Sequence, residues 1–356
     1  MSVAVAPGGP EFNRVLAMQM RRMVEHLING SSTGQSAADP LRQSQMALNF
    51  LGKAQQLGDM ETLVRLLEHF GGLLRTSSHA AVLDPFFELA LGGSDLSNAQ
   101  RVKLASLHAL LFIIRGELDH AEAVLDATWQ AADSPLLQAE LYIRQGVVLE
   151  VRSDFPRSKE AYDHALAIAQ VQNDLKLIMR AYISLGNWAY AKDAYNEAFT
   201  YYHKALTIAA EMQDVDGRAL AEGGLAMTLT ELKRYEEAVE YHREARIHYQ
   251  QTGSIGGLVR TDLNLSYLFI HQGNYEEAMQ LAAQALQHGR QLGDLEMEAM
   301  ALHNLGRACM LTGNYESASI YLNDALDKRQ WMGMPVYIEE TEAVLRELDN
   351  IREERV

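Results

Sequence analysis

The sequence predicts an all-α solenoid, an array of stacked helix pairs, and the main observation is a repeat of 40 residues. Five aromatic residues recur at this interval: Phe155, Tyr195, Tyr235, Tyr275 and Tyr315. A small residue precedes each of them by nine positions, at Gly146, Gly186, Ala226, Ser266 and Gly306. An alanine follows each of them by ten positions, at Ala165, Ala205, Ala245, Ala285 and Ala325. Small side chains at fixed positions allow close helix packing, and a self-similar unit of this length is typical of a solenoid.

Composition and charge narrow the class of partner. The 356 residues are 48% hydrophobic and carry 31 basic against 47 acidic side chains, a net charge of −16. This charge repels phosphate backbones and anionic lipid headgroups, so we expect neither nucleic acid nor a membrane as a partner. No apolar run approaches the roughly 18 residues of a membrane span. The single cysteine excludes an intramolecular disulfide, and residues 1–10 do not resemble a secretory signal, so a cytoplasmic protein is expected.

The first 40 residues are predicted to lie outside the array. Residues 1–10 are rich in glycine and proline, which predicts disorder. From Phe12 to Ile28 the apolar residues have the spacing of an amphipathic helix, and Asn29 with Gly30 provides its stop. Residues 31–40 are predicted to form a flexible tether between this helix and the array.

The array itself is predicted over residues 41–334, with about six to seven repeats of which the first are degenerate. Each regular unit is predicted to contain two antiparallel helices. Gly116, Gly273 and Gly313 are placed to end first helices in the left-handed conformation. Polar side chains that can cap the next helix precede successive units, at Ser134, Asp174, Asp214, Ser254 and Asp294.

Residues 335–356 are predicted to form a C-terminal capping helix. Apolar residues between Val336 and Ile351 have the spacing of one helix face, and charged residues occupy the rest of the helix. A solenoid needs such a terminal helix with a polar outer face for solubility.

The spacing of the repeat resembles the tetratricopeptide repeat family. The residues that carry it best are Gly186, Tyr195, Ala198, Tyr202 and Ala205, and the resemblance covers roughly residues 59–333. It implies a right-handed superhelix whose first helices line a concave groove. The usual repeat has about 34 residues and a proline near its end. The longer repeat without this proline is similar to those of kinesin light chains, spindle-orientation adaptors, bacterial peptide-pheromone receptors and the sensor regions of signalling ATPases.

The resemblance further implies that the groove binds a partner protein or peptide. Helical spacing places the following residues on the groove side of the first helices: Arg180, Ile183, Asn187, Tyr190, Met227, Arg260, Asn264, Tyr267, His303, Asn304 and Arg307. Arginines would pair with acidic groups, amides with a peptide backbone, and tyrosine and methionine would supply adaptable apolar surface. Alternatively, these residues pack between helices or face water.

No set of residues indicates an enzyme, a metal site or a cofactor. The twelve histidines include no i, i+4 pair with a nearby acid, and no phosphate-binding glycine loop or Ser-His-Asp grouping is present. We expect Cys309 to be a buried structural thiol.

Two functions remain open. The chain could be a non-enzymatic scaffold or adaptor that binds a peptide or helix of a partner in its concave groove, or a peptide-sensing regulatory domain that changes superhelix shape on binding. The N-terminal helix, Glu11 to Asn29, has three possible locations. It could pack on the N-terminal edge of the array, lie in the groove of its own or a neighbouring chain, or dock onto another protein.

Overall fold

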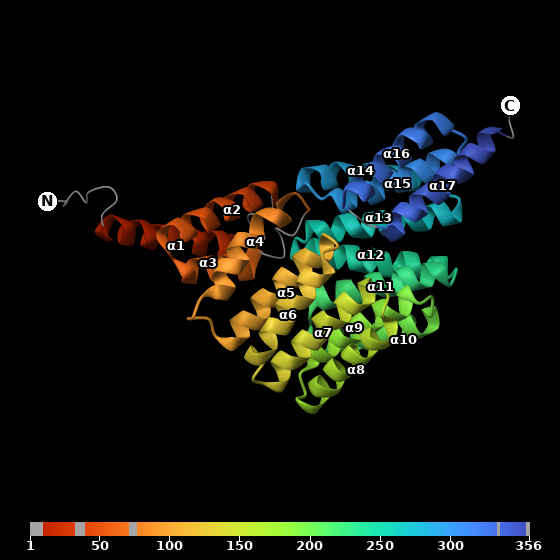
Figure 1. Cartoon of the computed structure of the whole chain (residues 1–356). Helices are drawn as coiled ribbons and strands as arrows, with labels where there is room; N and C mark the ends of the chain where they lie inside the picture. The colour runs from red at the N-terminus through yellow and green to blue at the C-terminus, as the bar shows by residue number, and fades with distance from the viewer. Residues whose placement is uncertain (1–9, 33–39, 71–76, 333–334, 354–356) are drawn as a thin grey trace.

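The computed structural model describes residues 10–32, 40–70, 77–332 and 335–353, and the regular structure in these segments is entirely helical (Figure 1). The helices are α1 Pro10–Ser32, α2 Pro40–Leu57, α3 Met60–Phe70, α4 Ser77–Gly92, α5 Asn98–Ile114, α6 Leu118–Thr128, a 3₁₀ turn Trp129–Ala131, α7 Pro135–Val151, α8 Phe155–Val171, α9 Leu175–Ala191, α10 Tyr195–Met212, α11 Val215–Glu231, α12 Tyr235–Thr252, α13 Ile255–Gln272, α14 Tyr275–Leu292, α15 Leu295–Leu311, α16 Tyr315–Met332 and α17 Pro335–Glu353. Consecutive helices pack against each other, which confirms the predicted solenoid.

The predicted caps begin the first helices of the regular units. The Asp174 carboxylate accepts a hydrogen bond from the backbone N–H of Leu177 at 2.9 Å. The side chains of Ser134, Asp214, Ser254 and Asp294 do the same for the residue three positions later. Each cap satisfies an N–H group that the first turn of a helix leaves without a partner.

Left-handed residues end the first helices of the units. Gly116, Gly273 and Gly313 have φ values of +74°, +80° and +82°, as predicted. Asp193 and Lys233 occupy the equivalent position with φ values of +57° and +59°, which the sequence did not indicate because residues other than glycine rarely adopt this conformation. Two backbone hydrogen bonds close each such turn and compensate for the strain.

The small residue of each unit is required by the side chain sixteen positions later. A Cβ at the glycines would approach that side chain much closer than van der Waals contact allows. The pairs are Gly146 with Tyr162 at 2.4 Å, Gly186 with Tyr202 at 2.7 Å and Gly306 with Leu322 at 2.6 Å. Where the small residue is Ala226 or Ser266, the residue sixteen positions later is the smaller His242 or Ala282. The sizes of the two positions compensate, so the interface stays filled without strain.

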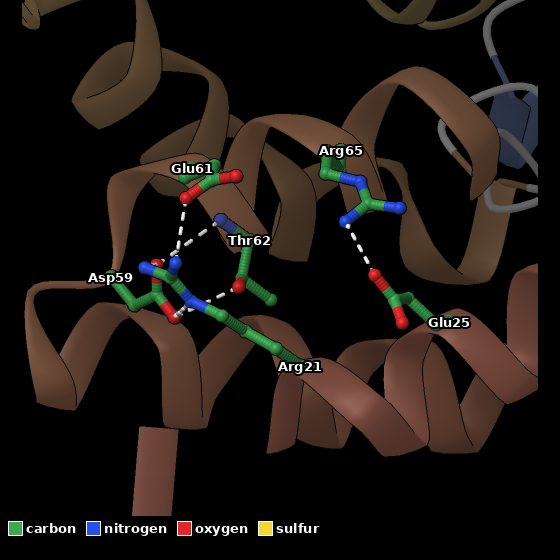
Figure 2. Close-up of polar contacts among 6 residues, drawn as sticks. All are labelled: Arg21, Glu25, Asp59, Glu61, Thr62 and Arg65. Atoms are coloured by element: carbon green, nitrogen blue, oxygen red, sulfur yellow. Dashed lines mark hydrogen bonds and ion pairs between the residues drawn. The ribbon is translucent and has the colours of Figure 1, made fainter. Parts of the chain in front are cut away.

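The N-terminal helix packs on the edge of the array. Met20, Val24 and Leu27 of α1 are buried in an apolar cluster with residues of α2 to α5. Arg21 donates hydrogen bonds to the Asp59 carboxylate at 2.7 and 2.9 Å and to Glu61 at 2.7 Å (Figure 2). Edge packing is therefore the location that the structure shows for this helix.

The predicted boundaries of the N-terminal helix were partly wrong. α1 continues to Ser32, so Asn29 and Gly30 do not end it. The helix therefore tolerates these two residues, whose unfavourable helix propensity is only a weak local preference. Disorder was predicted for residues 1–10 and a tether for residues 31–40, but Pro10 and residues 31–32 belong to α1 and Pro40 begins α2. Residues 1–9 and 33–39 lie outside the described residues.

The last helix is held by a buried arginine. α17 begins 40 residues after α15, so it takes the place of the first helix of a further unit. Arg329 of α16 is 3% exposed and donates to the Tyr337 carbonyl at 2.8 Å, to Glu340 at 3.2 Å and to the Thr341 hydroxyl. The exposed Arg346 stands where regular units carry the small residue. This polar outer face confirms the predicted capping helix.

The array is curved and its ends approach each other. Successive first helices from α5 to α15 contact one another, whereas the second helices have no comparably close neighbours among themselves. The first helices therefore form the inner, concave layer. At the N-terminal end, α2 contacts α14 and α4 contacts α15, so the chain curls back on itself (Figure 1).

Candidate functional site: the inner face of the first helices

The inner face is the concave side of α7, α9, α11, α13 and α15, and each helix contributes residues at equivalent repeat positions. Asn187, Met227, Tyr267 and Arg307 are spaced by 40 and form one row across four helices. Arg180 and Arg260 belong to a second row, two turns nearer the helix N-termini. These equivalent repeat positions put six of the predicted groove residues on the same side of their helices.

A tyrosine and acid network connects α9, α11, α13 and α15. The hydroxyls of Tyr190 and Tyr267 donate to the same Glu231 carboxylate oxygen, at 3.3 and 3.4 Å. The Arg307 guanidinium lies over the Tyr267 ring, 5.6 Å from its centroid. Burial and the nearby Glu231 carboxylate raise the pKa values of Tyr190 and Tyr267, so both phenols stay neutral and remain hydrogen-bond donors. The network places aromatic surface, a carboxylate and a cation within reach of one ligand.

Two further inner-face residues are engaged with neighbouring helices. Arg180 forms a half-exposed ion pair with Glu140 of α7. The exposed Asn187 accepts a hydrogen bond from the Tyr202 hydroxyl at 2.6 Å, and its amide N–H₂ donates to no group among the described residues. Sequence reasoning missed Glu140 and Glu231. The only signal for them was their position, on the same helices as the predicted stripe.

Not every predicted groove residue lies open. His303 and Asn304 are 2% and 6% exposed, so they do not lie open on the groove side on which the sequence placed them. The Asn304 amide donates to the Leu263 carbonyl at 3.0 Å, and Nδ1 of His303 lies 3.3 Å from Arg329. Both residues face the neighbouring helices because their positions fall on the flank of α15, where a small shift in helix rotation decides exposure.

The other predicted groove residues range from exposed to half-buried. Arg260 is exposed, while Met227 and Asn264 are half-buried. Ile183 is also half-buried and packs against an apolar cluster of α9, α10 and α11, so it stabilises the array. The predicted stripe thus combines open groups with groups that pack between helices.

Potential metal ligands do not cluster in the described residues. Groups of three or more His, Cys, Asp or Glu side chains that could hold a metal ion are absent from this part of the chain. Cys309 is 6% exposed and burial raises the pKa of its thiol, as expected for a structural cysteine. Across the described helices, none combines the length and hydropathy needed to span a bilayer.

Comparison with known proteins agrees with the repeat. Models of the tetratricopeptide repeat match residues 257–330 and, in a second form, residues 178–212 and 223–252. These matches show tetratricopeptide repeats in this part of the chain, in agreement with the helix-pair solenoid. A search of curated proteins found no match.

Solved structures share the fold at low sequence identity. A Rap protein complexed with Competence and Sporulation Factor is 13% identical, with a TM-score of 0.59 over 96% of this chain and 98% of that chain. A signal transduction ATPase with a tetratricopeptide repeat sensor from Pyrococcus horikoshii is 15% identical, with a TM-score of 0.57 over 92% of this chain but 54% of that chain. NprR in complex with its cognate peptide NprX is 16% identical, with a TM-score of 0.55 over 79% and 82% of the two chains.

Proposed function

We propose that the chain is a non-enzymatic, cytoplasmic scaffold that binds a peptide or helix of a partner protein on its inner face. The observation that carries the proposal is the row of polar and aromatic groups across four first helices, with Asn187, Tyr190, Tyr267 and Arg307 at its centre. A packing surface would be apolar, whereas this face offers a free amide, phenol rings and a cation. These groups suit main-chain and side-chain recognition of a peptide.

The structural neighbours support the same class of ligand. Rap is complexed with Competence and Sporulation Factor and NprR with its cognate peptide NprX, and both share the present fold. The identity of a ligand does not follow from a shared fold, because function depends on the residues of the site.

The test is to bind short labelled synthetic peptides from an array and to repeat the measurement by fluorescence anisotropy with variants. Tyr190→Ala and Arg307→Gln should each weaken binding about tenfold, since each removes a contact worth on the order of 1.5 kcal/mol. Arg243→Gln on the exposed side of α12 is the matched control and should leave affinity unchanged. Binding that survives both inner-face variants would contradict the proposal.

A second candidate function is a peptide sensor whose superhelix changes shape. The contacts of α2 with α14 and of α4 with α15 favour it, because a change in curvature would break them. The sensor differs from the scaffold in one measurable property, the overall dimensions of the chain with and without peptide.

A further inference from the structure

The inner face has a vacant position on α11. A Cβ added at Gly223 would meet no atom within 4 Å, and the glycine is partly accessible to solvent. The equivalent residues of the neighbouring units, Ile183 and Leu263, fill this position with side chains that join apolar clusters toward the next unit. α11 and α13 also contact each other only narrowly. Open space therefore exists beside Gly223, at the centre of the array.

The walls of this space on α11 are apolar. Leu220 and Met227 lie three positions before and four positions after Gly223, so the three residues form one stripe of the helix. Leu220 is 53% exposed and Met227 is half-buried. An exposed leucine and a flexible methionine beside a glycine suit the entry of an apolar side chain.

The wall on α13 is polar and not engaged. Asn264 has the same repeat position as Asn304, whose amide donates to the carbonyl of Leu263 on the preceding first helix. The corresponding bond from Asn264 to the Gly223 carbonyl is not formed, and the half-buried Asn264 side chain makes no hydrogen bond with the described residues. A half-buried amide without a partner favours binding of a ligand that supplies one.

A cation lies on α13, one helical turn before the residue equivalent to Gly223. Arg260 is exposed and forms no ion pair with an acid in the described segments, although the chain carries a net charge of −16. It precedes Leu263, the α13 equivalent of Gly223, by three positions. The Cα atoms of Gly223 and Arg260 are therefore roughly 10 Å apart for a rise of 1.5 Å per residue and 8–10 Å between helix axes. About three residues of extended chain, at ~3.3 Å each, cover this distance.

We propose that the inner face binds an extended acidic peptide, with an apolar side chain of the peptide seated over Gly223 and an acidic side chain about three residues away paired with Arg260. The glycine lets the peptide approach α11 closely, Asn264 hydrogen-bonds its main chain, and Arg260 selects its charge. This inference rests on the proposed function and specifies the ligand of the same face.

The test uses two sets of labelled synthetic peptides on an array. In the first set a leucine is followed three residues later by an aspartate, with the other positions randomised; in the second set lysine replaces the aspartate. We expect the full chain to bind the best members of the first set about tenfold more tightly than their lysine counterparts, because a charge-assisted pair with Arg260 is lost and replaced by repulsion. Arg260→Gln should remove this preference, whereas Arg243→Gln should retain it.

The Gly223→Ala variant separates binding from folding. Alanine has room at this position and a higher helix propensity, so the melting temperature should rise by about 2 °C. The affinity for peptide should nevertheless fall about tenfold, because the methyl group occupies the position where the apolar side chain of the peptide binds. Gly52→Ala in α2 is the matched control, since a Cβ there also meets no atom within 4 Å. It should raise the melting temperature similarly and leave affinity unchanged.

The outcomes distinguish this inference from the proposed function. If Tyr190→Ala and Arg307→Gln weaken binding while Gly223→Ala and Arg260→Gln do not, the inner face binds peptides, but the binding position assigned to Gly223 and Arg260 is wrong. Equal binding of the aspartate and lysine sets would overturn the charge assignment in particular. If none of the four inner-face variants changes binding, or no peptide binds, the proposed function fails together with the inference.

Discussion

At single positions of this repeat, the size of the side chain restricts substitution more than its polarity does. Gly186 is covered by the Tyr202 ring, whereas Gly52 and Gly223 have open space in place of a Cβ. The five alanines that follow the repeat aromatics by ten positions are all completely buried. Whether a glycine of this chain tolerates substitution therefore depends on whether neighbouring atoms fill the space that a Cβ would take.

Gly186→Leu should strongly destabilise the protein. The new side chain would collide with the Tyr202 ring, which is 4% exposed and has no free volume to move into. Overpacking of this kind costs about 1–3 kcal/mol or more. Urea denaturation should show a lower midpoint for Gly186→Leu and an equal or higher midpoint for Gly52→Ala. An unchanged midpoint for the leucine variant would contradict the packing described for this pair.

Asn264 and Asn304 occupy the same repeat position but should respond differently to alanine. Asn304→Ala removes the hydrogen bond to the Leu263 carbonyl and leaves a small cavity, so the free energy of unfolding should fall by about 1–2 kcal/mol. Asn264→Ala removes no such bond and should change stability by less than about 0.5 kcal/mol. Chemical denaturation of both variants measures the difference. Equal losses would show that the two amides have the same structural role.

Among the elements, α1 behaves as part of the array although its sequence is not part of the repeat. Its apolar residues Met20, Val24 and Leu27 cover α2 and α3, and Arg21 pairs with Asp59 at the start of α3. Burial of three such side chains contributes several kcal/mol in total, at about 1.5–3 kcal/mol each. The ion pairs contribute less, since Arg21 is 44% exposed.

Deletion of residues 1–38 should therefore lower both the melting temperature and the solubility. The deletion uncovers the apolar faces of α2 and α3, which then favour aggregation. Calorimetry and size-exclusion chromatography measure the two effects. A matched pair of point variants refines the test: Val24→Ser should destabilise the chain, while Met18→Ser, at a 54% exposed position, should not. A truncated chain that remains as stable as the full chain would contradict edge packing.

Helix α12, the second helix of its repeat unit, contains a histidine that should make the free energy of unfolding depend on pH. Burial lowers the pKa of His242 to about 3, and neither ring nitrogen has a hydrogen-bond partner in the described chain. In the unfolded chain the pKa is about 6.5. Stability is thus fully present above pH 6.5 and falls as the pH decreases toward 3, by about 1.4 kcal/mol per pH unit, because only the unfolded chain takes up the proton.

The measurement is the free energy of unfolding at pH 7 and at pH 4.5, for the wild type and for His242→Met. Carboxyl groups with raised pKa values, such as Glu150 at about 7, contribute to the wild-type curve with the opposite sign. The difference between the two proteins isolates the histidine: the variant should lose about 2–3 kcal/mol less than the wild type over this range. Parallel curves would show that His242 is hydrated or paired when the chain is folded.

For the whole molecule, the two candidate functions predict different solution shapes. The free chain should have the compact dimensions of an array in which α2 contacts α14 and α4 contacts α15. For a scaffold, small-angle scattering should give the same radius of gyration with and without saturating peptide. A reproducible change would instead support the sensor, because a ligand can shift a conformational equilibrium only when it binds the two shapes with different affinity.

The sequence by itself determined the repeat, the helix pairs and their caps, because these depend on local spacing. Asp174 and Ser254 cap helices for a reason contained within three residues of chain, and the 40-residue step of the aromatics is visible without any structure. The terminal helix α17 could also be predicted, since its apolar spacing and charged outer face are properties of one helix.

Only the tertiary structure decided which groove residues are open. Asn264 and Asn304 have the same position in the repeat, yet Asn304 is buried against α13 while the Asn264 side chain makes no hydrogen bond within the described chain. The reason is that α11 and α13 are less closely packed than α13 and α15. The network of Tyr190, Glu231 and Tyr267 likewise joins residues of three helices. Such features depend on the rotation and separation of neighbouring helices, and these are set by packing among many side chains, which no local pattern in the sequence specifies.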